Sequence, residues 1–200
     1  MPKIQLALDV LSAERALEIA QAASPWVDIL EAGTPLIKSA GIGIVSRLKV
    51  AHPTKLVLAD LKSTDVGAYE AAMGFRAGAD IVTTLGVTTL ATIEEVQREA
   101  NRWGRRCQVD LTGVADPVGK AHELKAIGVS FVLYHRSIDE EVTKGATWSE
   151  SVCRLVHELC GLGIDVAVAG GIGLDTLPRL QSCPLYAIVG LNTCPVSERK

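Results

Sequence analysis

The stretch Leu56-Val57-Leu58-Ala59-Asp60 is a short apolar run that ends in a carboxylate, and similar runs recur along the 200-residue chain. The other seven runs are residues 4–9, 27–31, 81–85, 107–110, 131–135, 166–171 and 186–190. Apolar runs of this length are typical of strands buried on both faces, as in a parallel sheet. A helix-like amphipathic segment separates each run from the next. We therefore predict a single-domain (β/α)8 barrel, or TIM barrel, over residues 1–200.

The helical segments between these runs are predicted from their periodicity and end signals. The expected helices span residues 13–23, 43–51, 67–77, 89–102, 118–126, 149–159 and 174–181. The stretch Gly33-Thr34-Pro35 is predicted to be a turn. Only residues 191–200 follow the last predicted strand, so we expect the final helix to be shortened or missing.

Composition and charge exclude several classes of protein. The net charge is −3 and no basic stripe is present, which argues against binding to nucleic acid. No apolar run approaches the length of a membrane span, so we expect no membrane partner. We expect no signal peptide, because the first predicted strand begins close to the N-terminus. The five cysteines form no CxxC pair, which favours reduced thiols in a cytoplasmic protein.

The segment Asp60-Leu61-Lys62-Ser63-Thr64-Asp65 carries the strongest chemical signal. Residues two apart in a strand point to the same side, so Lys62 is expected beside the Asp60 carboxylate and protonated. A fixed cation there would stabilise a substrate that becomes negatively charged during a reaction. The alternative is a surface ion pair, with Asp65 as the N-cap of the following helix.

Glu31 and Asp60 end neighbouring strands and predict a binding site for Mg²⁺, which prefers a few carboxylate ligands together with water and substrate oxygens. The alternative is a polar rim without metal. Asp9 and Asp110 also end strands, and they either contact substrate hydroxyls or satisfy nearby backbone donors.

His135 and Arg136 end the sixth predicted strand, where a histidine can act as a general base. Gly170, Gly171 and Gly190 close the seventh and eighth predicted strands. At these positions barrels commonly bind phosphate through backbone N–H groups. The sequence therefore predicts catalytic groups and a phosphate site on one rim of the barrel.

These residues together resemble the orotidine monophosphate decarboxylase suprafamily over nearly the whole chain. Asp60, Lys62 and Asp65 match its D-x-K-x-x-D signature, and Glu31 in Glu-Ala-Gly-Thr is similar to its Mg²⁺-dependent sugar-phosphate branch. That branch contains 3-hexulose-6-phosphate synthase and 3-keto-L-gulonate-6-phosphate decarboxylase. The segments that look like the synthase are residues 31–38, 59–67, 77–87 and 108–111.

The resemblance implies a lyase that acts on a sugar phosphate through an enediolate. Mg²⁺ on Glu31 and Asp60 would bind oxygens of D-ribulose 5-phosphate, His135 would remove a proton from C1, and the enediolate would attack formaldehyde. Lys62 would stabilise the negative charge. The resemblance also implies a homodimer, in which Asp65 reaches into the partner's active site.

Two alternatives to the synthase reaction stay open. Tyr-His-Arg-Ser (134–137) and Gly-Ala-Thr-Trp (145–148) look more like the decarboxylase, although Asp110, Ile138 and Ala169 are closer to the synthase pattern. A sugar-phosphate-binding protein without activity is the other alternative, because Leu191 follows Gly190 where the branch often has Arg or a small residue. We expect the synthase.

Overall fold

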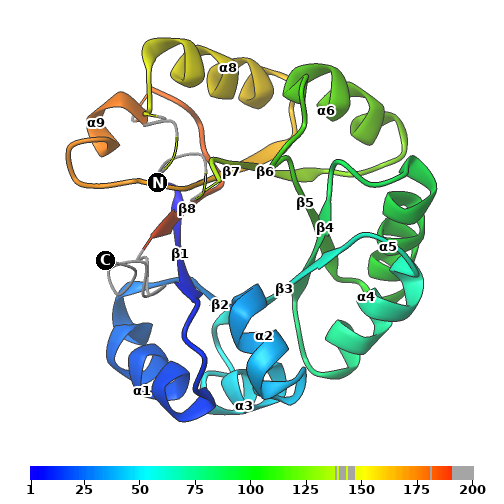
Figure 1. Cartoon of the computed structure of the whole chain (residues 1–200), viewed down its shortest axis with the longest axis vertical. Helices are drawn as coiled ribbons and strands as arrows, with labels where there is room; N and C mark the ends of the chain where they lie inside the picture. The colour runs from blue at the N-terminus through cyan, green and yellow to red at the C-terminus, as the bar shows by residue number, and fades with distance from the viewer. Residues whose placement is uncertain (138, 140–142, 144–146, 181, 191–200) are drawn as a thin grey trace.

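The chain folds into a closed barrel of eight parallel strands, which confirms the predicted fold class. The computed structural model describes residues 1–137, 139, 143, 147–180 and 182–190. Figure 1 shows the strands as an inner ring with the helices outside it. The strands are β1 (Lys3–Leu8), β2 (Ile29–Ala32), β3 (Leu56–Ser63), β4 (Ile81–Leu85), β5 (Arg106–Asp110), β6 (Phe131–His135), β7 (Asp165–Ala169) and β8 (Ala187–Gly190).

Apart from α2, the α-helices follow the predicted order, and several begin at side chains that cap their first turn. The helices are α1 (Ala13–Ala23), α2 (Thr34–Ala40), α3 (Gly43–Ala51), α4 (Gly67–Arg76), α5 (Leu90–Trp103), α6 (Pro117–Ala126), α8 (Glu150–Gly161) and α9 (Leu177–Leu180), with the 3-10 helix η1 (Ser24–Trp26). Capping side chains accept a hydrogen bond from the backbone N–H three residues later, and they are Ser12, Thr89, Asp116 and Ser149. These caps fix where those four helices begin.

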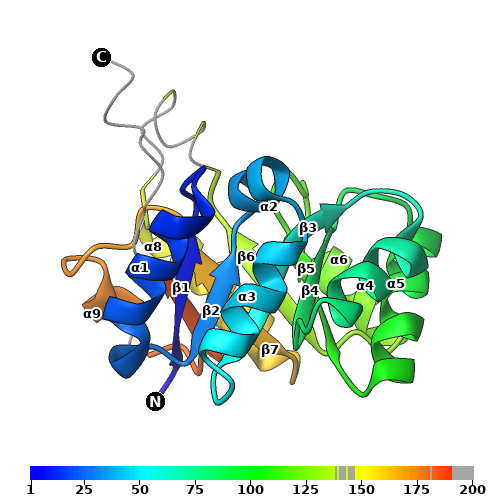
Figure 2. The ribbon, with the colours of Figure 1, turned by 90° about the horizontal axis from the view of Figure 1, so that it is seen from below.

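The prediction of a turn at Gly33-Thr34-Pro35 is wrong, because α2 begins at Thr34. Pro35 lies in the first turn of this helix, where its missing N–H has no partner to lose and its fixed φ suits the helix. Figure 2 shows α2 at the end of the barrel opposite the N-terminus. Helix α2 therefore flanks the rim at which the strands end. Helix α9 is also shorter than predicted and starts at Leu177.

The prediction for the final helix concerns residues 191–200, which lie outside the described residues. β8 ends at Gly190 and pairs with β1, which closes the barrel. Ile4 on β1 remains 48% exposed. None of the helices in the described part of the chain is long and apolar enough to cross a membrane.

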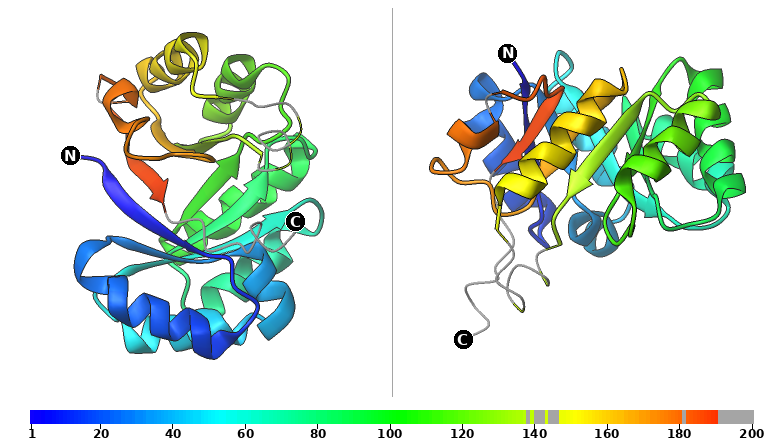
Figure 3. Two further views of the ribbon diagram at one scale, coloured as in Figure 1. Left: turned by 60° about the vertical axis from the view of Figure 1, so that its left-hand side comes forward. Right: turned by 90° about the horizontal axis from the view of Figure 1, so that it is seen from above.

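Apolar side chains fill the space on both sides of the sheet. The larger cluster joins the strands to the surrounding helices, which pack along the outer face of the sheet in both views of Figure 3. The smaller cluster includes Ile29, Leu58, Ile81 and Phe131. The first three lie two residues before Glu31, Asp60 and Thr83 on their strands, and so share the inner face with them. Glu31, Asp60 and Thr83 thus lie inside the barrel at the strand C-termini, directly above a layer of apolar side chains.

Candidate active site

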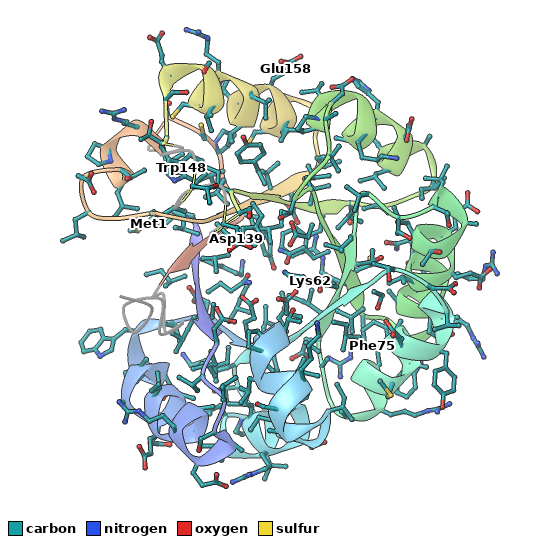
Figure 4. The ribbon with its side chains drawn as sticks, viewed as in Figure 1. Met1, Lys62, Phe75, Asp139, Trp148 and Glu158 are labelled. Carbon is teal, nitrogen blue, oxygen red and sulfur yellow. The ribbon has the colours of Figure 1, made fainter. Side chains whose placement is uncertain are left out.

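Lys62 lies at the centre of a charged network inside the ring of strands (Figure 4). Its Nζ lies 3.0 Å from Oδ1 of Asp60 and 3.0 Å from Oδ2 of Asp110. Asp60 is 5% exposed and Asp110 is fully buried. The network thus joins the ends of β3 and β5, and it places one ammonium group between two carboxylates.

The backbone of β3 bulges to bring Lys62 into this position. Ala59 pairs with Val82 and Ser63 pairs with Thr84, so four steps along β3 match two steps along β4. Lys62 has a left-handed φ of 48°, which is unusual for a residue with a side chain. Its N–H donates to Oγ1 of Thr83 at 2.9 Å, which stabilises the bulge. Lys62 lies beside Asp60 as predicted, but a bulge and not a regular strand places it there.

Two threonines hold the Asp60 carboxylate. Oγ1 of Thr34 donates to Oδ2 of Asp60 at 2.8 Å, and Oγ1 of Thr83 donates to Oδ1 at 2.7 Å. Thr34 is the first residue of α2 and Thr83 lies in β4. Both Asp60 oxygens therefore accept hydrogen bonds, and the orientation of the carboxylate is fixed from two sides.

Asp110 connects Lys62 to His135. Nδ1 of His135 lies 3.0 Å from Oδ2 of Asp110, while Oγ1 and N–H of Thr112 donate to Oδ1 at 2.6 and 2.9 Å. When Nδ1 carries the proton of this hydrogen bond, Nε2 is the nitrogen that can accept another proton. The contact with Asp110 thus fixes the His135 ring at the rim through its Nδ1 atom.

Opposite charges set the ionisation of this network. Burial acts to lower the pKa of Lys62, but the carboxylates of Asp60 and Asp110 outweigh it and hold the pKa above its usual value. Burial acts to raise the pKa of Asp110, but the hydrogen bond from His135 and the charge of Lys62 together hold it well below its usual value. At neutral pH the site therefore contains a protonated lysine and an ionised Asp110.

Glu31 and Asp9 extend the acidic side of the rim. Oε2 of Glu31 accepts a hydrogen bond from Nε2 of Gln5 at 2.7 Å. Burial, followed by the charges of Asp60 and Asp9, raises the pKa of Glu31 to about 8. Burial and the charge of Asp60 also raise the pKa of Asp9. The Asp9 carboxylate packs directly against Gly33. Only glycine allows this contact, because a Cβ at that position would lie 2.0 Å from Oδ1 of Asp9.

Glu31 and Asp60 are the side chains best placed to hold a divalent cation. Within the described residues, no group of three or more His, Cys, Asp or Glu side chains forms a metal site by itself. Mg²⁺ does not require such a cage, because it is usually bound by one or two carboxylates and completes its shell with water and substrate oxygens. The raised pKa of Glu31 reflects burial beside other carboxylates, and a cation there would offset both effects. The donor set therefore fits Mg²⁺.

The glycines predicted to bind phosphate lie on the side of the rim formed by β7 and β8. Gly170 and Gly171 have positive φ values of 93° and 56° and follow β7 directly. A Cβ at Gly170 would lie 2.2 Å from the backbone oxygen of Arg136, so the turn touches the end of β6. Among the described residues, apart from its chain neighbour, none has an atom within 4 Å of the position of a Cβ at Gly190, the last residue of β8.

Two of the predicted catalytic residues are placed away from the Lys62 network. Asp65 is exposed, and its Oδ1 accepts a hydrogen bond from the N–H of Val66. Arg136 is 7% exposed, and its guanidinium carbon lies 5.4 Å from the centre of the Trp148 ring. Successive residues at a strand end point to opposite faces, so Arg136 and His135 face different sides of β6. Their catalytic roles stay predictions.

Comparison with known proteins agrees with this geometry. The family model for orotidine 5'-phosphate decarboxylase / HUMPS matches residues 2–191. The chain belongs to the orotidine 5'-phosphate decarboxylase / HUMPS family. This membership confirms the resemblance inferred from Asp60, Lys62 and Asp65.

Within the orotidine 5'-phosphate decarboxylase / HUMPS family, the chain is similar to members with two named activities. It is 38% identical to 3-hexulose-6-phosphate synthase of Mycobacterium gastri, an alignment that covers 90% of the chain and 84% of the relative. It is 32% identical to 3-keto-L-gulonate-6-phosphate decarboxylase of Salmonella typhi, with 94% and 87% covered. Both names denote lyases. A crystal structure of KGPDC from Streptococcus mutans, solved in complex with a sugar phosphate, is 29% identical, with a TM-score of 0.89 and coverage of 94% and 87%.

Several residues that shape the candidate active site were not predicted from the sequence to be site residues. They are Gln5, Thr34, Thr83, Thr112 and Trp148. Thr83 follows the apolar residues Ile81 and Val82, and no charged neighbour marks it. A signal was present for Thr34, which directly follows the Glu31-Ala32-Gly33 segment at a strand end, and for Trp148, which ends the Gly-Ala-Thr-Trp segment that resembles the decarboxylase.

Proposed function

We propose that this chain is a 3-hexulose-6-phosphate synthase, which joins D-ribulose 5-phosphate and formaldehyde. The observation that carries the proposal is the connected set of Asp60, Lys62, Asp110 and His135 on one rim. The identity to the synthase, 38%, exceeds the 32% identity to the decarboxylase and supports the choice between the two. The sugar phosphate named in the S. mutans KGPDC complex supports a substrate of this class.

Each residue of the network has a role in this reaction. Nε2 of His135 removes a proton from C1 of the sugar, while Asp110 holds the ring through Nδ1. The Lys62 ammonium stabilises the negative charge that develops on the sugar oxygens. The resulting enediolate attacks formaldehyde through C1, the carbonyl π bond opens, and the protonated His135 returns its proton to the aldehyde oxygen. Asp60 keeps Lys62 in place and charged.

We propose that Glu31 and Asp60 hold Mg²⁺ in this reaction. When bound, the ion supplies positive charge that polarises the carbonyl and hydroxyl oxygens of the sugar. Asp9 adds negative charge beside this site, because its carboxylate interacts with that of Asp60. We infer that the phosphate of the substrate binds at the ends of β7 and β8, on the backbone N–H groups of Gly170, Gly171 and Gly190.

Removal of divalent cations is expected to abolish turnover, and Mg²⁺ is expected to restore it. In the same experiment Mg²⁺ should raise the melting temperature of the EDTA-treated protein, because an ion that binds only the folded state stabilises it. The variant Glu31→Gln should lose both responses. Full turnover after exhaustive EDTA treatment would contradict the metal role.

The decarboxylase reaction is the second candidate, because Tyr134-His135-Arg136-Ser137 and Trp148 follow that subgroup's pattern. Loss of CO₂ gives a similar enediolate, which Lys62 could also stabilise. Purified protein should be assayed with ribulose 5-phosphate plus formaldehyde and, separately, with 3-keto-L-gulonate 6-phosphate. We expect kcat/KM to be higher for the condensation. A higher value for CO₂ release would favour the decarboxylase, and no turnover of either would favour a binding protein.

We also propose a homodimer with shared active sites. Asp65 is exposed, lies outside the Lys62 network of its own chain, and precedes α4 by two residues. Exposed apolar side chains follow it. The exposed fractions of these side chains are 59% for Val66, 72% for Tyr69 and 38% for Met73. Tyr69 and Met73, four residues apart, lie on one face of α4, and Val66 directly precedes that helix. A second copy that covers this face would bring each Asp65 towards the partner's site.

Subunit mixing tests the shared site. Lys62→Ala and Asp65→Ala proteins should each be nearly inactive, whereas a hybrid dimer contains one site with both residues intact. With equal amounts and full exchange, half of the dimers are hybrids, so about one quarter of the wild-type activity should return. Light scattering should show a dimer. A monomer, or no recovery after verified exchange, would contradict the proposal.

A further inference from the structure

Trp148 lies between the ends of β6 and β7 and helix α9, outside the charged network (Figure 4). It is only 3% exposed. Three side chains of the surrounding elements contact it. The ring centres of Tyr134 and Trp148 lie 6.0 Å apart, and the Arg136 guanidinium carbon lies 5.4 Å from the centre of the Trp148 ring. Nη1 of Arg179 donates to the backbone oxygen of Trp148 at 3.1 Å.

The indole N–H of Trp148 makes the contact that bears on the substrate. Nε1 donates to the backbone oxygen of Gly170 at 2.8 Å. A trans peptide unit is planar, so the carbonyl of Gly170 and the N–H of Gly171 lie in one plane and point in opposite directions. A hydrogen bond that fixes the Gly170 carbonyl therefore also fixes the direction of the Gly171 N–H.

The glycine turn needs such a restraint. Gly170 and Gly171 both adopt positive φ, and glycine has the greatest backbone freedom of any residue. The close approach of Gly170 to the Arg136 oxygen limits the turn from one side. Trp148 restrains the turn through the Gly170 carbonyl, and Arg179 in turn holds the backbone of Trp148.

We propose that Trp148 is a positioning residue for the phosphate group of the substrate, which it serves by aiming the Gly171 N–H. The inference rests on the proposed function, in which Gly170 and Gly171 bind that phosphate. Trp148 does not touch the reacting carbon. Its loss should therefore weaken phosphate binding and leave the chemical step largely unchanged.

The variant Trp148→Phe tests the hydrogen bond, because it keeps an aromatic ring against Tyr134 and Arg136 but has no N–H. We expect KM for ribulose 5-phosphate and Kd for inorganic phosphate to rise together by roughly 3- to 10-fold, the usual effect of one hydrogen bond. We expect kcat to change less than about twofold. Phosphate binding is measured by ³¹P NMR titration and folding by circular dichroism.

Trp103→Phe is the matched control. Nε1 of Trp103 donates to Oε1 of Glu99 at 2.8 Å on α5, so this variant loses a similar hydrogen bond away from the glycine turn. We expect unchanged KM and phosphate Kd. Arg179→Met is the second test, and it should raise both constants in the same direction by a smaller factor. Its result decides the question if Trp148→Phe does not fold.

The outcomes separate this inference from the proposed function. Unchanged KM and phosphate Kd in folded Trp148→Phe, with an active wild type, would overturn the positioning role and leave the function intact. A fall in kcat at constant KM would also overturn it. If the wild type turns over neither substrate but binds phosphate, and Trp148→Phe weakens that binding, then the proposed function fails and the positioning role stands.

Discussion

Replacing Lys62 by alanine is expected to lower kcat/KM by roughly 10²- to 10³-fold, the usual cost of removing one preorganised group that stabilises developing charge. The effect should be large because Nζ lies between Asp60 and Asp110, where no other described cation is bonded to both carboxylates. Lysine and alanine share the cost of the positive φ at this position, so the backbone strain does not change.

Lys49→Ala is the matched control for this variant. Lys49 is bonded to the buried Asp80 at 2.7 Å, and its side chain is 27% exposed, compared with 28% for Lys62. Asp80 directly precedes β4, so this ion pair lies at the opposite end of the barrel. The melting temperature should fall in both variants, but only Lys62→Ala should have a lower turnover rate. Wild-type turnover by folded Lys62→Ala would remove the electrostatic role assigned to Lys62.

Replacing His135 by asparagine is expected to slow turnover by roughly 10²- to 10⁴-fold, the range that general base catalysis contributes. Asparagine can still donate a hydrogen bond to Asp110, so the local structure should persist while the proton acceptor is lost. His122→Asn on α6 is the control, because His122 is exposed and lies outside the site. Steady-state kinetics of both variants measures the difference. Equal rates in the two variants would assign the base role to another residue.

The barrel could be predicted from the sequence because each buried parallel strand leaves a continuous apolar run. Helix α2 could not, because glycine and proline in Gly33-Thr34-Pro35 mark turns as often as helix starts. Proline is compatible with the first helical turn, and only the packing beside β3 decided between the two. The outcome for residues 191–200 lies outside the described part of the chain.

The strand-end carboxylates could also be found from the sequence, whereas the side chains to which most of them are hydrogen-bonded could not. The bulge at Lys62 depends on the register between β3 and β4, and no pattern in the nearby sequence predicts it. The bond between Asp110 and His135 joins residues of two different strands that are 25 positions apart in the sequence. Threonines such as Thr34 and Thr83 carry no charge, so their role at Asp60 becomes visible only when the strands meet.

The central claim is that this site removes a proton from C1 of ribulose 5-phosphate to form an enediolate. Proton NMR in deuterated water, with Mg²⁺ but without formaldehyde, tests it most directly. The account predicts that the wild-type protein exchanges the C1 proton for deuterium and that His135→Asn exchanges it far more slowly. Absence of exchange in a wild-type protein that condenses the sugar with formaldehyde would contradict the account.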